Sequence, residues 1–502
     1  MEKYILSKST FIRGTQCPKS LYLYKNFFNQ RDKISAAQEA IFSRGTNVGV
    51  LARNIFPGGT DASPKSRLKF SESVLLTQKL IEQGCEIIYE AAFQFNRTLV
   101  AMDMIVKRGG AWYAYEVKSS TRITPTYILD AALQYYVICH SGLDLADISI
   151  VNVNTDYERQ GKLNYNELFK ISSVRNEVMQ KQDFVRDNLQ RLLDIAGDPN
   201  QPSVQIGQQC FSPYACDFMG TCWKAIPENS VLNLNGVAKG ELFQLYNNGI
   251  KTLDEIPLSY PLNKQLKLQV ECGLSNNVHI DREGLGKFMD TIHYPLYFMD
   301  FETIMPAVPV FDKTHPYQHI PFQFSIHFKE TKNAEPVHVD FLAEAGTDPR
   351  RQFVEELIRQ TSVPGDILTY NATFERSILI QLKKQFPAYA DAIDYIIYRI
   401  KDLMFPFENK LYYHPLMKGS YSIKNVLPAL AGGIDYENLR IGSGSVAMTA
   451  FENLQSETDL YKIAETRDAL KAYCQLDTLA MVKILDVLEH SLANNSGINK
   501  GG

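Results

Sequence analysis

The sequence predicts an α/β protein built from two separate mixed regions. At 502 residues the chain is too long for one ordinary hydrophobic core. Short apolar runs typical of strands interchange with segments of helical periodicity up to about residue 195, and again after about residue 290. A composition of 45% hydrophobic and 22% charged residues excludes a largely disordered chain.

The first region is predicted to form an α/β sandwich. A helix is followed by three strands, a second helix and a closing strand, an order that suits this fold class. The expected helices are residues 66–84 and 124–142, and the expected strands are residues 85–95, 97–108, 111–120 and 146–154.

The rest of the chain is predicted to contain a helical connection and a second α/β sheet. From about residue 290, three strands precede alternating helices and strands. We expect strands at 295–303, 321–328, 337–343 and 366–371, and helices at 350–361 and 373–386. The predicted parts are a first domain at 1–225, a helical middle at 226–288, a second domain at 289–495 and a flexible tail at 496–502.

The bulk properties indicate a cytoplasmic protein without a membrane partner. The formal charge of −4 gives no overall basic field, so nucleic-acid binding would rely on local patches. The N-terminal MEKYILSKST lacks the apolar segment of a signal peptide, and no uninterrupted membrane-spanning run is seen. We therefore expect the eight cysteines to be thiols or metal ligands rather than disulfides.

The segment YPLYFMDFET ends an apolar strand in two acids, which are costly to bury without cationic partners. Asp300 and Glu302 point to the same face of that strand. Glu375 lies in the first turn of a later helix, and Tyr473 and Asp477 lie four apart on a distal helix. Such carboxylates can hold two Mg²⁺ or Mn²⁺ ions about 3.5–4 Å apart for in-line attack of water on phosphate. Tyr473 would orient or deprotonate that water.

The order of these motifs resembles the DEDD 3′–5′ exonuclease superfamily in its tyrosine variant. The matching motifs are DFE, YNATFE and YCQLD. The resemblance implies an RNase H-like fold, with the four acids as metal ligands. The second motif has Glu375 where the family usually has Asp, and Asp402 is a nearby spare acid. The alternative is that Asp300 caps a turn and the other residues face solvent.

A second acidic constellation lies in the predicted hairpin LVAMDMIVKRGGAWYAYEVKSS. Asp103 lies on its first strand, while Glu116 and Lys118 share one face of the second. Two carboxylates can bind Mg²⁺ while the lysine positions water and balances charge on phosphate. Asp130 and Gln134 lie four apart on the next helix. The alternative is an ordinary strand pair with solvated Glu and Lys neighbours.

This arrangement resembles the PD-(D/E)XK nuclease fold, particularly its RecB-like branch. The resemblance implies that Asp103, Glu116, Lys118 and Gln134 are catalytic residues and that the first two bind metal. The chain departs from the family in two ways. The segment RGTNVGVLAR lacks the histidine of many RecB-like nucleases. Tyr135 and Tyr136 directly follow Gln134 rather than lying at the usual spacing.

Four cysteines bracket the predicted nuclease core. Cys210, Cys216 and Cys222 recur at five-residue gaps, and Cys17 lies far earlier. Thiolates in a loop-rich cytosolic segment suit a soft metal, either Zn²⁺ or an iron–sulfur cluster, and reactive or merely buried thiols are the alternative. The remaining cysteines lie in apolar patterns and are expected to be buried: Cys85, Cys139, Cys272 and Cys474.

The split arrangement resembles the iron–sulfur RecB-like nucleases, which include the CRISPR-associated RecB-like exonucleases and the AddB-type repair nucleases. The resemblance implies Cys17, Cys210, Cys216 and Cys222 as ligands of a structural cluster, 4Fe–4S in type, with zinc as the alternative. Nearly the whole chain is also similar to the bacterial family called domain of unknown function 2779. Segments such as YPLYFMDFET, YYHPLMKGSYSIKNVLPAL and SPYACDFMGTCW carry that similarity. It implies a nuclease class but no substrate.

Two weaker patterns are candidates for nucleic-acid contacts. LNGVAKGELFQLYNNGIKTLDEIP resembles a helix-hairpin-helix element whose turn at Gly249 aims N–H groups at a phosphate, although a helical spacer fits equally well. HPLMKGSYSIKNV offers Lys418, Ser420 and Lys424 to a nucleic-acid backbone, or else forms an ordinary helix start.

These patterns together predict a metal-dependent nuclease with two candidate active sites. The expected partner is nucleic acid, with single-stranded or resected DNA favoured over RNA. One alternative is a nucleic-acid-binding scaffold of repair or defence in which one or both sites have degenerated. Another is a zinc-stabilised regulatory protein with no catalytic role.

Overall fold

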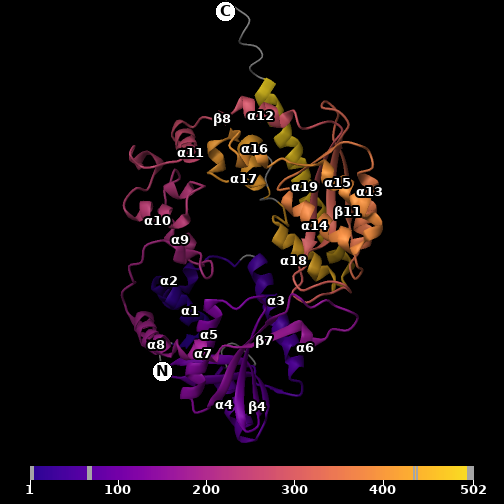
Figure 1. The fold of residues 1–502 in the computed structure, drawn as a ribbon. Coiled ribbons are helices and arrows are strands. Elements are labelled where there is room, and N and C mark those ends of the chain that lie inside the picture. The colour runs from indigo at the N-terminus through magenta and orange to yellow at the C-terminus, as the bar shows by residue number, and fades with distance from the viewer. Residues whose placement is uncertain (1–4, 35, 65–69, 433–435, 437–438, 494–502) are drawn as a thin grey trace, which may run out of the picture. The chain divides into compact units, whose positions relative to one another are not determined.

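The chain divides into two compact units (Figure 1). The computed structural model describes residues 5–34, 36–64, 70–432, 436 and 439–493. The first unit comprises Met1–Ala225 and Pro306–Gln318, and the second comprises Ile226–Met305 and His319–Gly502. The expected helical middle is therefore part of the second unit, and the expected tail lies outside the described residues.

A seven-stranded mixed sheet forms the centre of the first unit, in the order β2-β3-β4-β5-β6-β7 with β1 pairing with β4. Strands β3, β4 and β5 form an antiparallel meander, and β6 is parallel to β5 because the helix α5 connects them. The four predicted strands are confirmed. The strands are β1 (Leu6–Ser7), β2 (Thr60–Asp61), β3 (Ile87–Phe95), β4 (Thr98–Arg108), β5 (Ala111–Lys118), β6 (Leu145–Val153) and β7 (Phe169–Ser173).

Helices cover both faces of this sheet, so strand residues alternate between two cores. On β5, Trp112 and Ala114 belong to the core shared with α1, α5 and α8, whereas Tyr115 belongs to the core on the α3 side. Glu116 lies on the same face of β5 as Trp112 and Ala114 and therefore points toward α5. The helices are α1 (Lys8–Gln16), α2 (Pro18–Asn26), α3 (Ala36–Ala52), α4 (Phe70–Glu82), α5 (Pro125–His140), α6 (Tyr165–Leu168), α7 (Arg175–Met179), α8 (Gln182–Gly197) and α9 (Met219–Cys222).

The second unit contains a five-stranded sheet in the order β11-β10-β9-β12-β13. Strands β9, β10 and β11 are antiparallel, and β12 and β13 continue the sheet in parallel. This confirms the predicted sequence of three strands followed by alternating helix and strand. The strands are β9 (Leu296–Ile304), β10 (Ile320–Lys329), β11 (Val337–Leu342), β12 (Asp366–Thr369) and β13 (Ile400–Asp402), and β8 (His279–Ile280) pairs separately with β14 (Tyr412–Tyr413).

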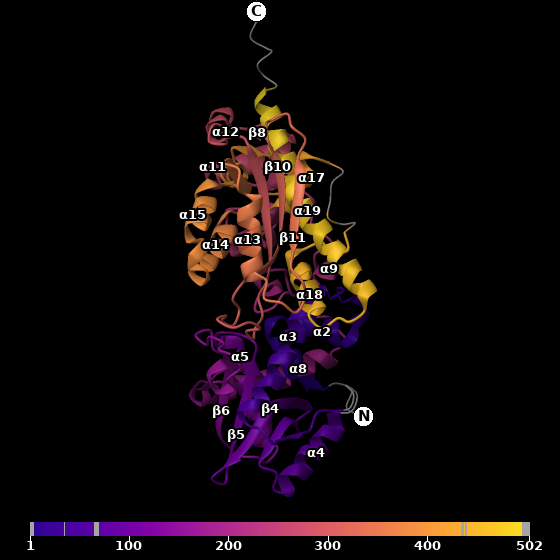
Figure 2. The same cartoon turned by 90° about the vertical axis from the view of Figure 1, so that its right-hand side faces the viewer.

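Figure 2 shows this sheet between two layers of helices. Helices α13, α14 and α15 lie on one side, and α17, α18 and α19 lie on the other. Phe301 of β9 packs edge-on against Phe353 of α13, so the alternate residues Asp300 and Glu302 face α19. The helices are α10 (Lys239–Asn247), α11 (Lys264–Ser275), α12 (Arg282–Met289), α13 (Arg350–Gln360), α14 (Thr373–Gln385), α15 (Ala390–Arg399), α16 (Phe405–Glu408), α17 (Ile423–Leu430), α18 (Gly444–Leu454) and α19 (Leu460–Ala493). Throughout the described ranges, each helix is too short or too polar to cross a bilayer.

Candidate functional sites

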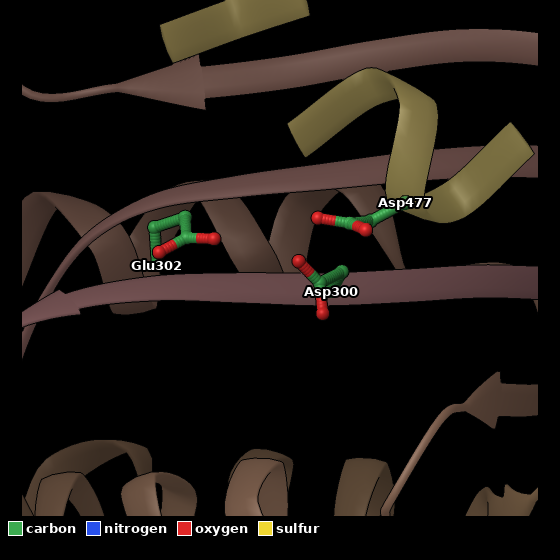
Figure 3. Close-up of side chains that lie close together, drawn as sticks. All are labelled: Asp300, Glu302 and Asp477. Atoms are coloured by element: carbon green, nitrogen blue, oxygen red, sulfur yellow. The ribbon is translucent and has the colours of Figure 1, made fainter. Parts of the chain in front are cut away.

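Three carboxylates of the second unit converge on one point. Asp300 and Glu302 project from the central strand β9, and Asp477 projects from α19, which packs on that strand. One oxygen from each of the three lies within 4.8 Å of the others. Figure 3 shows the two strand acids and the helix acid turned toward one another. This donor set of hard oxygen ligands fits Mg²⁺ or Mn²⁺.

Burial and mutual repulsion keep this cluster from ionising freely. Burial, together with the charges of Asp477 and Glu302, raises the pKa of Asp300 well above its usual range. Burial and the charge of Asp477 raise the pKa of Glu302 to about 8, and burial raises that of Asp477 to about 6. Part of the cluster therefore carries protons at neutral pH, and a bound cation would replace those protons.

Glu375 lies at the edge of this cluster rather than among the three closest acids. It stands in the first turn of α14 and is only 2% exposed, and its Oε2 has no hydrogen-bond partner among the described residues. Burial raises its pKa to about 8, and its charge contributes to the raised pKa of both Asp300 and Glu302. An unpartnered buried carboxylate oxygen is an available metal ligand. The assignment of Glu375 as a fourth ligand stays a prediction.

Asp402, the spare acid noted in the sequence, accepts hydrogen bonds from three backbone N–H groups. Its carboxylate accepts backbone N–H groups from Asn371 at 3.0 Å, Ala372 at 2.9 Å and Met404 at 2.9 Å. Asn371 has a left-handed φ of 74°, and α14 begins two residues later. Asp402 therefore fixes the turn that presents Glu375.

Two tyrosines line the carboxylate cluster, and one of them was not identified from the sequence. Tyr436 donates a hydrogen bond to Oδ1 of Asp477 at 2.6 Å. Burial and the charge of Asp477 raise the pKa of both Tyr436 and Tyr473. Tyr473 is therefore a neutral phenol at physiological pH, which fits the orienting role expected of it and disfavours the deprotonating role. Tyr436 lies between helices in a stretch without periodicity, so no pattern marked it.

Lys424 faces this cluster, and its predicted role in binding a nucleic-acid backbone stays a prediction. Its Nζ donates to the carbonyl of Gly442 at 2.6 Å and lies over the rings of Tyr436 and Tyr473 at 5.1 and 5.4 Å. Its positive charge lowers the pKa of Glu302 and that of Asp477. Lys424 is thus a cationic partner of the buried acids.

The other residues predicted to contact a nucleic-acid backbone have local partners. Lys418 is half-exposed and lies 3.9 Å from the Glu228 carboxylate, and Ser420 Oγ accepts the Ser422 N–H at 3.3 Å. The Gly249 N–H donates to the Tyr246 carbonyl at the end of α10. A one-turn 3₁₀ segment, Leu253–Glu255, follows the turn where a short second helix was expected. The capping bonds of α10 use N–H groups of the turn, and the role of Gly249 in binding phosphate stays a prediction.

The predicted N-terminal residues also come together. Glu116 is 1% exposed; its Oε1 lies 2.9 Å from Lys118 Nζ, and its Oε2 accepts from Gln134 Nε2 at 2.7 Å. Lys118 Nζ also donates to Asp130 at 2.7 Å. The carboxylate of Asp103 accepts the N–H of Val117, the residue between the ExK acid and lysine, at 2.6 Å. The two strands and α5 thus build one cluster.

A second lysine completes this cluster. Lys8 of α1 also donates to Oε1 of Glu116. Although burial opposes ionisation, Lys118 and Lys8 lower the pKa of Glu116 to about 2, and the same pairing raises the pKa of Lys118. Burial and the Glu116 charge raise the pKa of Asp103 to about 8. Lys8 could not be identified from the sequence, because its contact with Glu116 spans 108 residues.

The four cysteines predicted as metal ligands line one cavity together with Trp223. Cys17 lies between α1 and α2, and the other three come from 210–222. Burial and the nearby thiols raise the pKa of Cys17, and they raise the pKa of Cys222 in the same way. Of the four cysteines expected to be buried, Cys272 and Cys474 are buried as predicted, whereas Cys85 and Cys139 are only partly buried.

Comparisons with known proteins match part of the chain. Residues 297–422 match the family model described as Domain of unknown function (DUF2779). That span includes Asp300, Glu302 and Glu375 but ends before Asp477. The chain is also 28% identical over 209 residues to a protein of Mycoplasma pneumoniae (strain ATCC 29342 / M129) described as "Uncharacterized protein MG366 homolog". That match covers 37% of this chain and 31% of the Mycoplasma protein, so the chain spans about a third of its relative's length.

Proposed function

We propose that the protein is a metal-dependent nuclease that hydrolyses phosphodiester bonds, with single-stranded or resected DNA as the substrate. The observation that carries the proposal is the convergence of Asp300, Glu302 and Asp477 within 4.8 Å on a buried sheet face. Divalent cations held there would activate water and stabilise the charge that develops on phosphate. The order of the motifs supports a DEDD-like exonuclease unit with an RNase H-like fold.

The side chains of the second unit supply the remaining roles. Tyr473, kept neutral by its raised pKa, would hold the attacking water through its hydroxyl group. Tyr436 fixes Asp477 through a direct hydrogen bond, so the orientation of one ligand is set in advance. Lys424 offsets part of the negative charge when the acids ionise.

The first unit would supply a RecB-like nuclease site. Asp103 and Glu116 offer carboxylate oxygens to a cation, and Lys118, held between Glu116 and Asp130, is placed to balance charge on phosphate. Gln134 keeps Glu116 in place through its amide.

The cysteine cavity would hold the soft metal centre of the first unit. Cys17, Cys210, Cys216 and Cys222 all line it as free thiols. Four thiolates can ligate an iron–sulfur cluster, which the split arrangement of the cysteines implies, or tetrahedral zinc as the alternative.

The deciding experiment uses anaerobically purified protein, Mn²⁺ and single-stranded DNA labelled at either end. Lys118→Ala and Asp300→Ala each disable one unit, so loss of cleavage identifies the working site and the labelled fragments give its polarity. The expected result is cleavage that Asp300→Ala abolishes. If DNA and RNA both stay intact with metal-replete protein, the nuclease proposal fails.

A nucleic-acid-binding scaffold is the second candidate. It is favoured by the internally paired charges of the N-terminal cluster, where two lysines already neutralise Glu116. A scaffold would bind DNA tightly without metal and without cleavage. Cleavage that either alanine variant abolishes would exclude it.

A further inference from the structure

Lys8 is positioned by the fold itself. The short strand β1 pairs in parallel with β4, with Leu6 opposite Thr98 and Ser7 opposite Leu99. Ser7 then caps α1, because its side chain accepts the Thr10 N–H while the Thr10 hydroxyl accepts the Ser7 N–H. Lys8 is the first helical residue, so its backbone is fixed on both sides.

The bonds around Glu116 leave little room for another ligand. Two ammonium groups, from Lys8 and Lys118, share its Oε1, and the Gln134 amide takes Oε2. A cation that binds Oε1 must therefore displace an ammonium group. Lys118 remains held by Asp130 at 2.7 Å, whereas the side-chain bonds of Lys8 within the described residues end on Glu116. Lys8 is the group that can leave.

The Lys8 side chain can move toward solvent. It is 30% exposed, whereas the Glu116 side chain is 2% exposed, so the lysine lies between the buried acid and solvent. Substrate must approach the cluster from the solvent side. An ammonium group released there would meet the phosphate backbone.

We propose that Lys8 holds the place of a divalent cation on Glu116 and moves to a substrate phosphate when that cation binds. This inference rests on the proposed nuclease function of the first unit. It makes Lys8 a competitor of the metal in free protein and a contact for DNA in the metal-bound protein.

Metal binding tests the first half of this proposal. Asp300→Asn removes one ligand of the second unit, so that the metal site of the first unit is measured. Mn²⁺ binding is then measured by calorimetry on chelator-treated protein. Removing the competing charge with Lys8→Met should tighten Mn²⁺ binding about tenfold or more. Lys8→Arg keeps the competitor and should bind no more tightly than the parent. Lys170→Met, at an exposed position of β7, is the matched control and should have no effect.

DNA binding tests the second half. With Ca²⁺ in place of Mn²⁺, Lys8→Met should weaken single-stranded DNA binding about threefold to tenfold, because a phosphate contact is lost. Without metal the same variant should bind DNA as the parent does, since Lys8 is then tied to Glu116. Circular dichroism melting confirms that each variant is folded.

Either result can overturn the inference. Unchanged or weaker Mn²⁺ binding by folded Lys8→Met refutes the placeholder role, and so does equal loss of DNA binding with and without Ca²⁺. If Lys8→Met does not fold, tighter Mn²⁺ binding by Lys8→Arg refutes it. A protein that never cleaves nucleic acid but shows the Mn²⁺ effect would refute the proposed function and leave Lys8 as a metal competitor.

Discussion

Replacing Glu302 with Gln should make the metal-free second unit more stable above neutral pH. The folded-state pKa of Glu302 is raised from 4.5 to about 8 by burial and by the charge of Asp477. Below pH 4.5 the carboxyl is protonated in both the folded and unfolded chain, so it costs nothing. As pH rises from 4.5 to 8 the unfolded chain loses the proton first, and the folded state is progressively destabilised.

The size of the effect follows from the same two values. A pKa raised from 4.5 to about 8 corresponds to at most about 5 kcal/mol of lost stability once the group is ionised. At about 2 °C per kcal/mol for a unit of this size, Glu302 alone should lower the melting temperature of chelated protein by up to about 10 °C between pH 5 and pH 8.5. The neutral amide of Glu302→Gln should remove this contribution, while Asp300 and Glu375, whose pKa values are also raised, keep theirs.

Differential scanning calorimetry is the suitable assay, because both tryptophans, Trp112 and Trp223, belong to the first unit and do not report on the second. Glu330→Gln, which removes an exposed carboxyl of the second unit, is the control and should melt as the parent does. Saturating Mn²⁺ should restore stability at high pH, by about 2.7 kcal/mol at one hundred times its Kd. A chelated parent protein equally stable at pH 5 and pH 8.5 would refute this account of Glu302.

Three further substitutions test other parts of the structure. Lys424→Met should raise the pKa of the neighbouring carboxyls and thereby raise the pH midpoint of Mn²⁺ binding by about one pH unit. Lys418→Met should leave this midpoint unchanged. Calorimetric titration with Mn²⁺ across pH 6–9 measures the midpoint in both variants. Asp402→Ala leaves three backbone N–H groups without their acceptor and should lower the unfolding free energy by about 2–4 kcal/mol in urea; a loss below 0.5 kcal/mol would contradict its role in the turn. Cys17→Ser should lose most of the iron and sulfide of anaerobic protein while Cys85→Ser keeps both, and equal iron in the two variants would exclude Cys17 as a ligand.

Local periodicity explains which site residues could be predicted. Asp300 and Glu302 share a face because strand side chains alternate, and Tyr473 and Asp477 share one because they lie about one helical turn apart. The same alternation placed Glu116 and Lys118 together. The strands and helices around them were predicted for the same reason, since their apolar residues recur with the period of the element.

Contacts between distant segments explain what could not be predicted. Lys8 meets Glu116 through the pairing of β1 with β4, and Tyr436 reaches Asp477 from a stretch between helices. Asp402 was expected to be a free acid, yet it accepts three N–H groups of loops that flank β12 and β13. Lys424 follows a polar segment whose sequence is typical of an exposed loop. The packing of α17 on α19 places its side chain toward the carboxylate cluster.

The two clusters should differ in how metal binding depends on pH. In the second unit Glu302 and Glu375 have pKa values of about 8 and that of Asp300 is also well raised, so a cation must displace several protons near neutral pH. In the first unit Glu116, with a pKa of about 2, is already ionised and only Asp103 carries a proton to about pH 8. The logarithm of Mn²⁺ affinity should therefore rise with pH more steeply in a Glu116→Gln variant, which retains the second cluster, than in Glu302→Gln, which retains the first. An equal or reversed steepness between pH 6 and 8 would show that the charge balance inferred for the two clusters is wrong.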